Sequence, residues 1–110
     1  MNFVTLIFAG GFLCNCVPHL AGGLQGAPFP TPFAKPSGIG DSSPLVNFLW
    51  GASNGIAGWS LLAIHPVSIG FSLEFGAFLL GALLIGLHLS IHFAKVRKAR
   101  LAGTASTDHC

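Results

Sequence analysis

The sequence predicts an all-α membrane protein: a single domain over residues 1–110, with three transmembrane helices in a small bundle. Three observations lead to this fold class. Of the 110 residues, 52% are hydrophobic and only 7% are charged, whereas about 25% of the residues of a soluble domain are charged. Three apolar segments follow one another along the chain, each long enough to cross the hydrocarbon core of a bilayer. A run of basic residues follows the third segment directly, as is typical of the cytoplasmic end of a span.

The first predicted helix covers residues 3 to 24, an apolar run of the length that a bilayer requires. A cleaved signal peptide is the alternative for this segment. A signal peptide, however, has a positively charged start and a cleavage site of small residues, and here Asn15, Pro18 and His19 follow the apolar run instead. We therefore expect the segment to be retained as a helix.

A loop rich in Pro and Gly is predicted for residues 25 to 43, between the first two helices. Its Pro residues remove backbone donors and fix φ, so a continuous helix cannot form there. Phe29, Phe33 and Ile39 are apolar, and we expect the loop to fold against the helix ends or the bilayer surface. Ser43 followed by Pro44 is typical of an N-cap and a first helical residue, which predicts where the next helix begins.

The second predicted helix covers about residues 44 to 65 and carries a polar and small-residue stripe. At about 100° per residue, one side of this helix collects two amides and several glycines. An Asn in hydrocarbon needs hydrogen-bond partners, and Gly lets another backbone come close enough to supply them. The sequence therefore predicts that this is the middle helix, with a helix docked on either side. The stripe consists of Asn47, Gly51, Asn54, Gly55, Gly58 and His65.

The third predicted helix covers about residues 68 to 94, and the residues from 101 to 110 are predicted to be a disordered tail. Four basic residues lie between 95 and 100, which predicts a cytoplasmic C-terminus by the positive-inside rule. With three spans, the N-terminus then faces outward and the loop at 25 to 43 faces the cytoplasm. The expected location is the bacterial inner (cytoplasmic) membrane, where the lipid bilayer surrounds a multi-pass protein.

One part of the chain, from residue 15 to about 58, contains several recognisable motifs. They are Asn15, Pro-His at 18–19, Phe-Pro-Thr-Pro-Phe-Ala at 29–34, Ser-Ser-Pro at 42–44 and Asn-Phe-Leu-Trp-Gly at 47–51. This part resembles a group of small bacterial integral membrane proteins for which no activity is known. The resemblance implies a three-helix membrane fold and adds no site residue.

Three histidines are candidate metal ligands, because the predicted topology places all of them in the same leaflet. His88 and His92 are four residues apart on one helical face, and His19 lies near the corresponding end of the first helix. Imidazole suits zinc, copper or iron, and Cys16 is an additional candidate. The simpler interpretation is that the two histidines near Lys95 are interfacial side chains that reach headgroups and water. No cofactor is expected under that interpretation, and metal or haem is expected under the first.

Glu74 is the one carboxylate inside a predicted span, on the same helical side as Gly81, His88 and His92. An ionisable group in a membrane is a candidate for a proton or ion pathway. Glu74 is also close enough to the outer end of its helix to meet water or to pair with His65. Asn15 gives the first helix a polar stripe as well, and we interpret this stripe, Gly81 and the stripe of the second helix as helix-packing features.

The sequence contains no Gly-rich phosphate loop, no Cys-x-x-Cys motif and no nucleophile elbow, so it points to no enzyme activity and no catalytic residue. The basic run is a topology signal, and no nucleic-acid partner is expected. The predicted function is that of a non-catalytic accessory or structural subunit that packs against other membrane proteins or against itself as a homo-oligomer. The alternatives are a metal- or haem-binding redox protein using the histidines, and a small transporter or proton-conducting oligomer built on Glu74 and Asn54.

Overall fold

The computed structural model describes residues 2–108, with the side chains of residues 2–103. It is mostly helical, as the sequence predicts, and it contains three helices and one very short pair of strands. The elements in chain order are α1 (Phe3–Leu24), β1 (Phe29–Pro30), β2 (Asp41–Ser42), α2 (Pro44–Ile64) and α3 (Leu73–Asp108). The strands are antiparallel, with Phe29 opposite Ser42 and Pro30 opposite Asp41.

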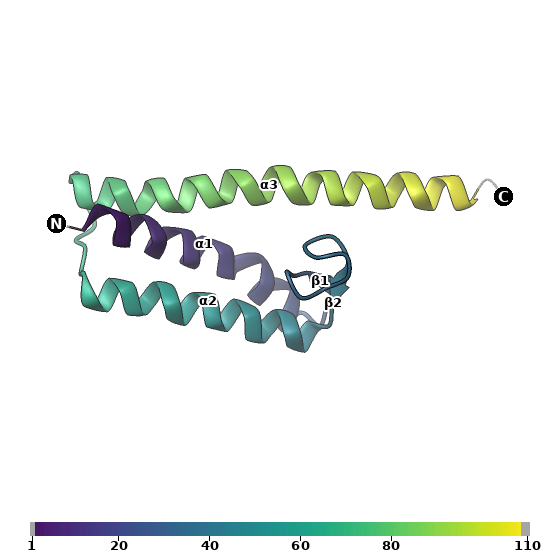
Figure 1. Cartoon of the computed structure of the whole chain (residues 1–110), viewed down its shortest axis with the longest axis horizontal. Helices are drawn as coiled ribbons and strands as arrows, with labels where there is room; N and C mark the ends of the chain where they lie inside the picture. The colour runs from purple at the N-terminus through teal and green to yellow at the C-terminus, as the bar shows by residue number, and fades with distance from the viewer. Residues whose placement is uncertain (1, 109–110) are drawn as a thin grey trace.

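The middle helix of the structure is α1, which differs from the sequence prediction for residues 44 to 65. Figure 1 shows α1 between α2 and α3, and both of these helices pack against it. The reason is that α1 has small residues on two sides: Gly10 and Gly11 face α3, and Gly23 faces α2. Helix α2 has only one such stripe, and one stripe serves one neighbour.

Hydrogen-bonding side chains determine where α2 and α3 begin. The Ser43 side chain accepts a hydrogen bond from the Val46 amide (3.2 Å), with Pro44 directly after it, where the sequence predicts the start of this helix. In α3 the Ser72 hydroxyl accepts from the Phe75 amide (3.1 Å). The third helix therefore begins at Leu73 and not near residue 68, since Gly70 before it has a positive φ of 154° that a helix does not contain.

At its other end, α3 is longer than predicted. It continues past residue 94 to Asp108 and so includes residues 101–108, where the sequence predicted a disordered tail. Lys, Arg, Ala and Leu, which fill residues 94–102 apart from one Val, are good helix formers, and no Pro follows to end the helix. Residues 109–110 of the predicted tail lie outside the described residues.

The loop between α1 and α2 folds back onto α3. The Nε2–H of His92 donates a hydrogen bond to the Gly38 carbonyl (2.6 Å), and the Arg100 guanidinium contacts the Asp41 carboxylate (2.9 Å) and the Ile39 carbonyl. The loop therefore lies at the same end of the helices as the basic run of α3, against the helix ends.

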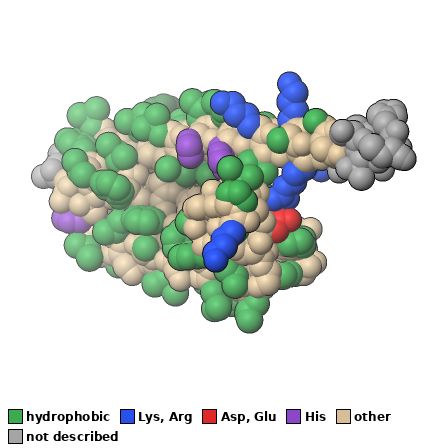
Figure 2. Space-filling view, turned by 45° about the vertical axis from the view of Figure 1, so that its right-hand side comes forward, with side chains coloured by type: hydrophobic (Ala, Val, Ile, Leu, Met, Phe, Trp, Pro, Cys, Tyr) green, Lys and Arg blue, Asp and Glu red, His purple; other side chains and the backbone are tan. Residues whose placement is uncertain are grey.

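Several polar side chains are buried in this protein, and many large apolar side chains are exposed. Asn47, His19 and Asn54 are 0%, 1% and 3% exposed, whereas Trp59 is 71% and Leu83 is 69% exposed. Figure 2 shows hydrophobic side chains over much of the face that it presents, with Lys and Arg near the end where α3 extends. Two helices, α1 and the Leu73–Gly103 part of α3, are long and apolar enough to cross a membrane.

Candidate functional site

Glycines on α2 bring its backbone against α1 along most of its length. A Cβ added to Gly58 would lie 3.0 Å from the Ala9 carbonyl oxygen, and one added to Gly51 would lie 2.8 Å from the Leu20 amide nitrogen. Near the other end, a Cβ on Gly23 of α1 would lie 2.6 Å from the Phe48 nitrogen. Gly55 is looser, because its added Cβ would meet only the Cys16 side chain, in ordinary contact at 3.7 Å.

The same close approach allows two amides to join α1 to α2. The Asn15 Nδ2 donates a hydrogen bond to the Asn54 Oδ1 (3.0 Å), and the Asn54 Nδ2 donates to the Trp50 carbonyl (2.8 Å). Asn54 is thus held by its own helix and presents its oxygen to α1. Both amides are therefore part of the contact between α1 and α2.

His19 is buried against Asn47, and this contact defines its tautomer. The Asn47 Nδ2 donates to the carbonyls of Phe29 (2.8 Å), Ser42 (3.2 Å) and Ser43 (3.1 Å), which turns its Oδ1 toward the His19 Nδ1 at 2.9 Å. An amide oxygen can only accept, so His19 donates from Nδ1, and in the neutral ring Nε2 is then the acceptor. The pair ties α1, α2 and the start of β1 together.

The contact between α1 and α3 is also made through glycine. A Cβ on Gly81 would overlap the Ile7 carbonyl, and one on Gly10 would overlap the Phe78 carbonyl. Gly81, which the sequence marked as a packing residue, is therefore in the closest part of this interface.

The three histidines proposed as metal ligands do not form one ligand set in the described part of the chain. His88 and His92 stack on each other, with ring centroids 6.0 Å apart and an angle of 12° between the ring planes. His92 is bonded to the loop at Gly38, and His19 is bonded to Asn47. Among the described residues, no three His, Cys, Asp or Glu side chains form a set that could hold a metal ion. The geometry therefore gives no specific support to the metal or haem alternative.

Glu74 lies in the first turn of α3, far from the histidines on the same helix. Fourteen residues of helix separate it from His88, which is about 21 Å at 1.5 Å per residue. Glu74 does not line the cavity described next, so the geometry offers no specific support for a proton pathway that joins Glu74 to Asn54.

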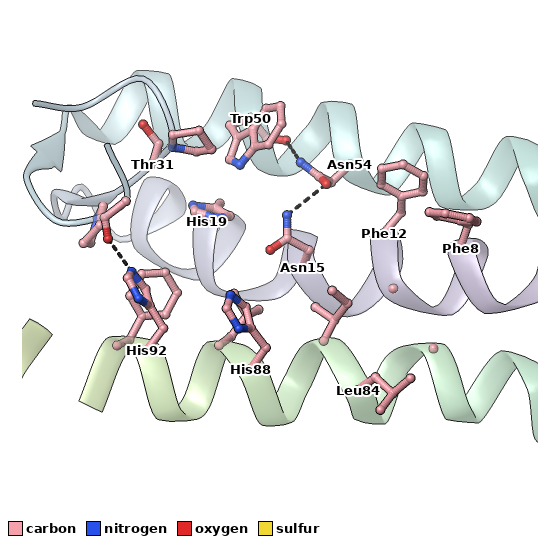
Figure 3. Close-up of a pocket in the computed structure, with 18 of the residues that line it drawn as sticks. Phe8, Phe12, Asn15, His19, Thr31, Trp50, Asn54, Leu84, His88 and His92 are labelled. Atoms are coloured by element: carbon pink, nitrogen blue, oxygen red, sulfur yellow. Dashed lines mark hydrogen bonds between the residues drawn. The ribbon is translucent and has the colours of Figure 1, made fainter. Parts of the chain in front are cut away.

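A cavity of about 540 Å³ lies between α1, α2, α3 and the loop. Figure 3 shows that residues from all three helices and the loop point into it. One end is apolar and includes Phe8, Phe12 and Leu84. The other end, next to the loop, is lined by Asn15, His19, Thr31, Trp50, Asn54 and His88. No Lys, Arg, Asp or Glu lines this cavity in the described part of the chain.

Trp50 lines this cavity, although the sequence does not single it out as a site residue. Its indole Nε1 is buried and has no hydrogen-bond partner among the described residues. The ring is flanked by Phe33 of the loop (centroids 5.1 Å apart, edge-on) and by His19 (6.4 Å). The sequence does contain an indication of its place. Trp50 lies between Asn47 and Asn54 at helical spacing, and it belongs to the Asn-Phe-Leu-Trp-Gly motif at 47–51.

Comparison of the chain with protein-family models, with curated proteins and with solved structures gave no match. The functional proposals below therefore stand on the residues and their geometry.

Proposed function

We propose that this chain is a three-span integral membrane protein that serves as a non-catalytic accessory or structural subunit, packing against other membrane proteins or against itself. The observation that carries the proposal is the reversed burial of polar and apolar side chains. Asn47 and His19 are buried, while many of the large apolar residues of the helices are exposed. Such a surface is unfavourable in water and favourable in hydrocarbon, where buried amides bind helices together.

The third span in this proposal is α2, which is less apolar than the other two helices. Its 21 residues correspond to about 31 Å of helix, close to the roughly 30 Å thickness of the hydrocarbon core. Its Asn residues face α1, and its outward residues, such as Leu49, Ile56 and Trp59, are apolar and exposed. Helix α2 contacts α1 over the stretch from Phe48 to Gly58. In this proposal it therefore lies at the same depth in the membrane as α1.

The proposed location is the bacterial inner membrane, with the C-terminus in the cytoplasm and the N-terminus outside. The basic residues at 95–100 support this orientation through the positive-inside rule. Arg100 binds Asp41 and Ile39, so the Pro-rich loop goes with the basic run to the cytoplasmic side.

The non-catalytic role is supported by the way in which the polar groups are used. Asn15 is bonded to Asn54, His19 is bonded to Asn47, and Thr31 is bonded to Ser42. Each of these bonds joins two segments of the chain, which is what a structural polar group does.

The support for a partner comes from one face of α3. Gly51, Gly58 and Gly81 pack against α1. The helix faces that carry them are therefore not free to bind a partner. The side of α3 turned away from α1, which we call the outer face, is apolar and exposed, and a Cβ added to its glycine would meet nothing within 4 Å. A transmembrane helix can approach closely at such a glycine. The outer face consists of Gly76, Leu79, Leu80, Leu83 and Leu87.

The test is extraction of the full chain in a mild detergent, followed by native sizing and mass spectrometry of the proteins that co-purify. We expect a reproducible complex, with a partner membrane protein or with a second copy. Replacing Leu83 and Leu87 by Ala should reduce the complex, because a partner helix loses packing there. The matched control replaces Leu49 and Ile56 of α2 by Ala, which shortens side chains that face lipid. A chain that is monomeric in every preparation, or an equal loss in both variants, would contradict the proposal.

A further inference from the structure

The cavity beside α1 changes from polar to apolar along its length. Its residues run along α1 from Phe8 at the apolar end to His19 next to the loop, which is about 16 Å of helix. In the three-span arrangement proposed above, the loop lies at the end of the helices where the bilayer meets water, which puts the polar end of the cavity at the depth of lipid headgroups. The apolar end lies deeper, at the level of the hydrocarbon. The gradient matches an amphiphile with a polar head and an apolar chain.

The polar end of the cavity has an unused hydrogen-bond donor. The Trp50 Nε1–H has no acceptor among the described residues, and an indole nitrogen only donates. In Figure 3 this nitrogen is on the edge of the ring that faces His19 and Asn15, toward the cavity. A buried donor without an acceptor is unfavourable, so the group that completes this end of the cavity is an acceptor.

The charge of the lining shows what kind of acceptor fits. No Lys, Arg, Asp or Glu lines the cavity in the described part of the chain. An ionised head placed there would lie among amides, histidines and aromatic rings, with no permanent charge to pair with. The Asn15 and Asn54 amides each have one further N–H beyond the bond that the structure records. The volume of about 540 Å³ is in the range of small-molecule sites, which are mostly apolar with a few converging polar groups.

We propose that this cavity binds a neutral lipophilic molecule that carries a carbonyl oxygen, which accepts a hydrogen bond from the indole N–H of Trp50. A membrane offers two sources of this chemistry, a quinone ring with an alkyl tail and the acyl ester of a neutral glyceride. In both, the carbonyl lies at the polar end of the cavity and the alkyl chain extends along Phe12 and Phe8. Binding rests on the three-span arrangement proposed above, but it involves this chain alone and does not depend on the accessory role.

The experiment measures binding of three labelled probes to the purified full chain in lipid nanodiscs: decylbenzoquinone, monodecanoylglycerol and decylbenzene, which has no carbonyl. The two tryptophans supply a matched pair of variants, because Trp59 is 71% exposed on the outside of α2. Trp50→Phe removes the donor and keeps an aromatic ring, and we expect it to weaken binding of a carbonyl probe about three- to ten-fold, the effect of one hydrogen bond. Trp59→Phe should leave the affinity unchanged.

A second pair of variants tests the shape of the cavity. Leu84 lines the cavity and Leu83 does not, so Leu84→Phe should narrow it and weaken binding, whereas Leu83→Phe should have no effect. If Trp50→Phe differs from the unmodified chain in helicity or in particle size, the variant is misfolded, and the Leu84 and Leu83 variants then provide the test. The carbonyl probe that binds more tightly identifies the source of the ligand. Equal binding of decylbenzene, or equal affinities within both pairs of variants, would overturn the proposal, whatever partner the chain has.

Discussion

Two glycines one turn apart on α2 allow a direct test of the packing between α1 and α2. An ideal Cβ at Gly51 would lie 2.8 Å from the Leu20 nitrogen and 3.1 Å from the Cys16 carbonyl oxygen. Both atoms belong to the backbone of α1 and cannot rotate away. To reach ordinary contact at 3.4 Å, the two helices must separate by about 0.6 Å at this point, and overpacking of this kind costs about 1–3 kcal/mol. The Cβ at Gly55 would lie 3.7 Å from the Cys16 Sγ and displaces nothing.

The variants Gly51→Ala and Gly55→Ala share the gain of up to about 1 kcal/mol in helix propensity, so this gain cancels when the two are compared. We expect Gly55→Ala to be more stable than Gly51→Ala by about 1–3 kcal/mol. The free energy of unfolding is measured by far-UV circular dichroism while the purified chain is titrated with a denaturing detergent in mild-detergent micelles. Equal unfolding midpoints for the two variants would refute the close approach of α1 and α2 at Gly51.

Three further predictions concern polar and charged residues. Asn54→Leu removes the hydrogen bond from Asn15, and it should lower the free energy of unfolding by roughly 1 kcal/mol, on the scale of hydrogen bonds in membranes; an unchanged midpoint would show that this bond is not formed. Asp41→Asn breaks a partly exposed ion pair with Arg100 and should change the midpoint by less than about 1 kcal/mol; a larger loss would mean that the loop depends on this pair. Replacing the four basic residues at 95–100 by Gln should mix the two orientations in the membrane, and a C-terminal reporter that stays entirely cytoplasmic would contradict that expectation.

The sequence predicts the elements of this fold better than their arrangement. The Ser43–Pro44 pair indicates the start of α2 because N-capping depends only on neighbouring residues. The spacing of Asn47, Gly51 and Asn54 places them on one side of the helix for the same local reason, and the structure buries them on that side. The identity of the helix in the middle depends on both sides of α1. The sequence shows one stripe on this helix, through Asn15, and does not show that Gly10 and Gly23 contact two different neighbours.

The cavity could not be predicted, because it depends on the loop. Residues 25–43 bring Thr31 and Phe33 next to α1 and α2, and nothing in the order of Pro and Gly residues fixes that path. The same applies to His19. Its spacing along the chain fits a group with His88 and His92 in one leaflet, but the register between α1 and α2 gives it Asn47 as a partner. Pairing across helices is a tertiary property that periodicity within one helix does not contain.

The central proposal, three spans with α2 as the third, is tested most directly by the position of the two connections. Ser37 in the loop and Ser68 between α2 and α3 are both exposed. Each can be changed to Cys in a chain whose three native cysteines are replaced by Ala. A membrane-impermeant maleimide is then added to intact spheroplasts. The proposal predicts that Ser68→Cys is labelled at once and Ser37→Cys only after permeabilisation. Labelling of both residues from the same side would show that α2 does not cross the membrane, and would contradict the proposal.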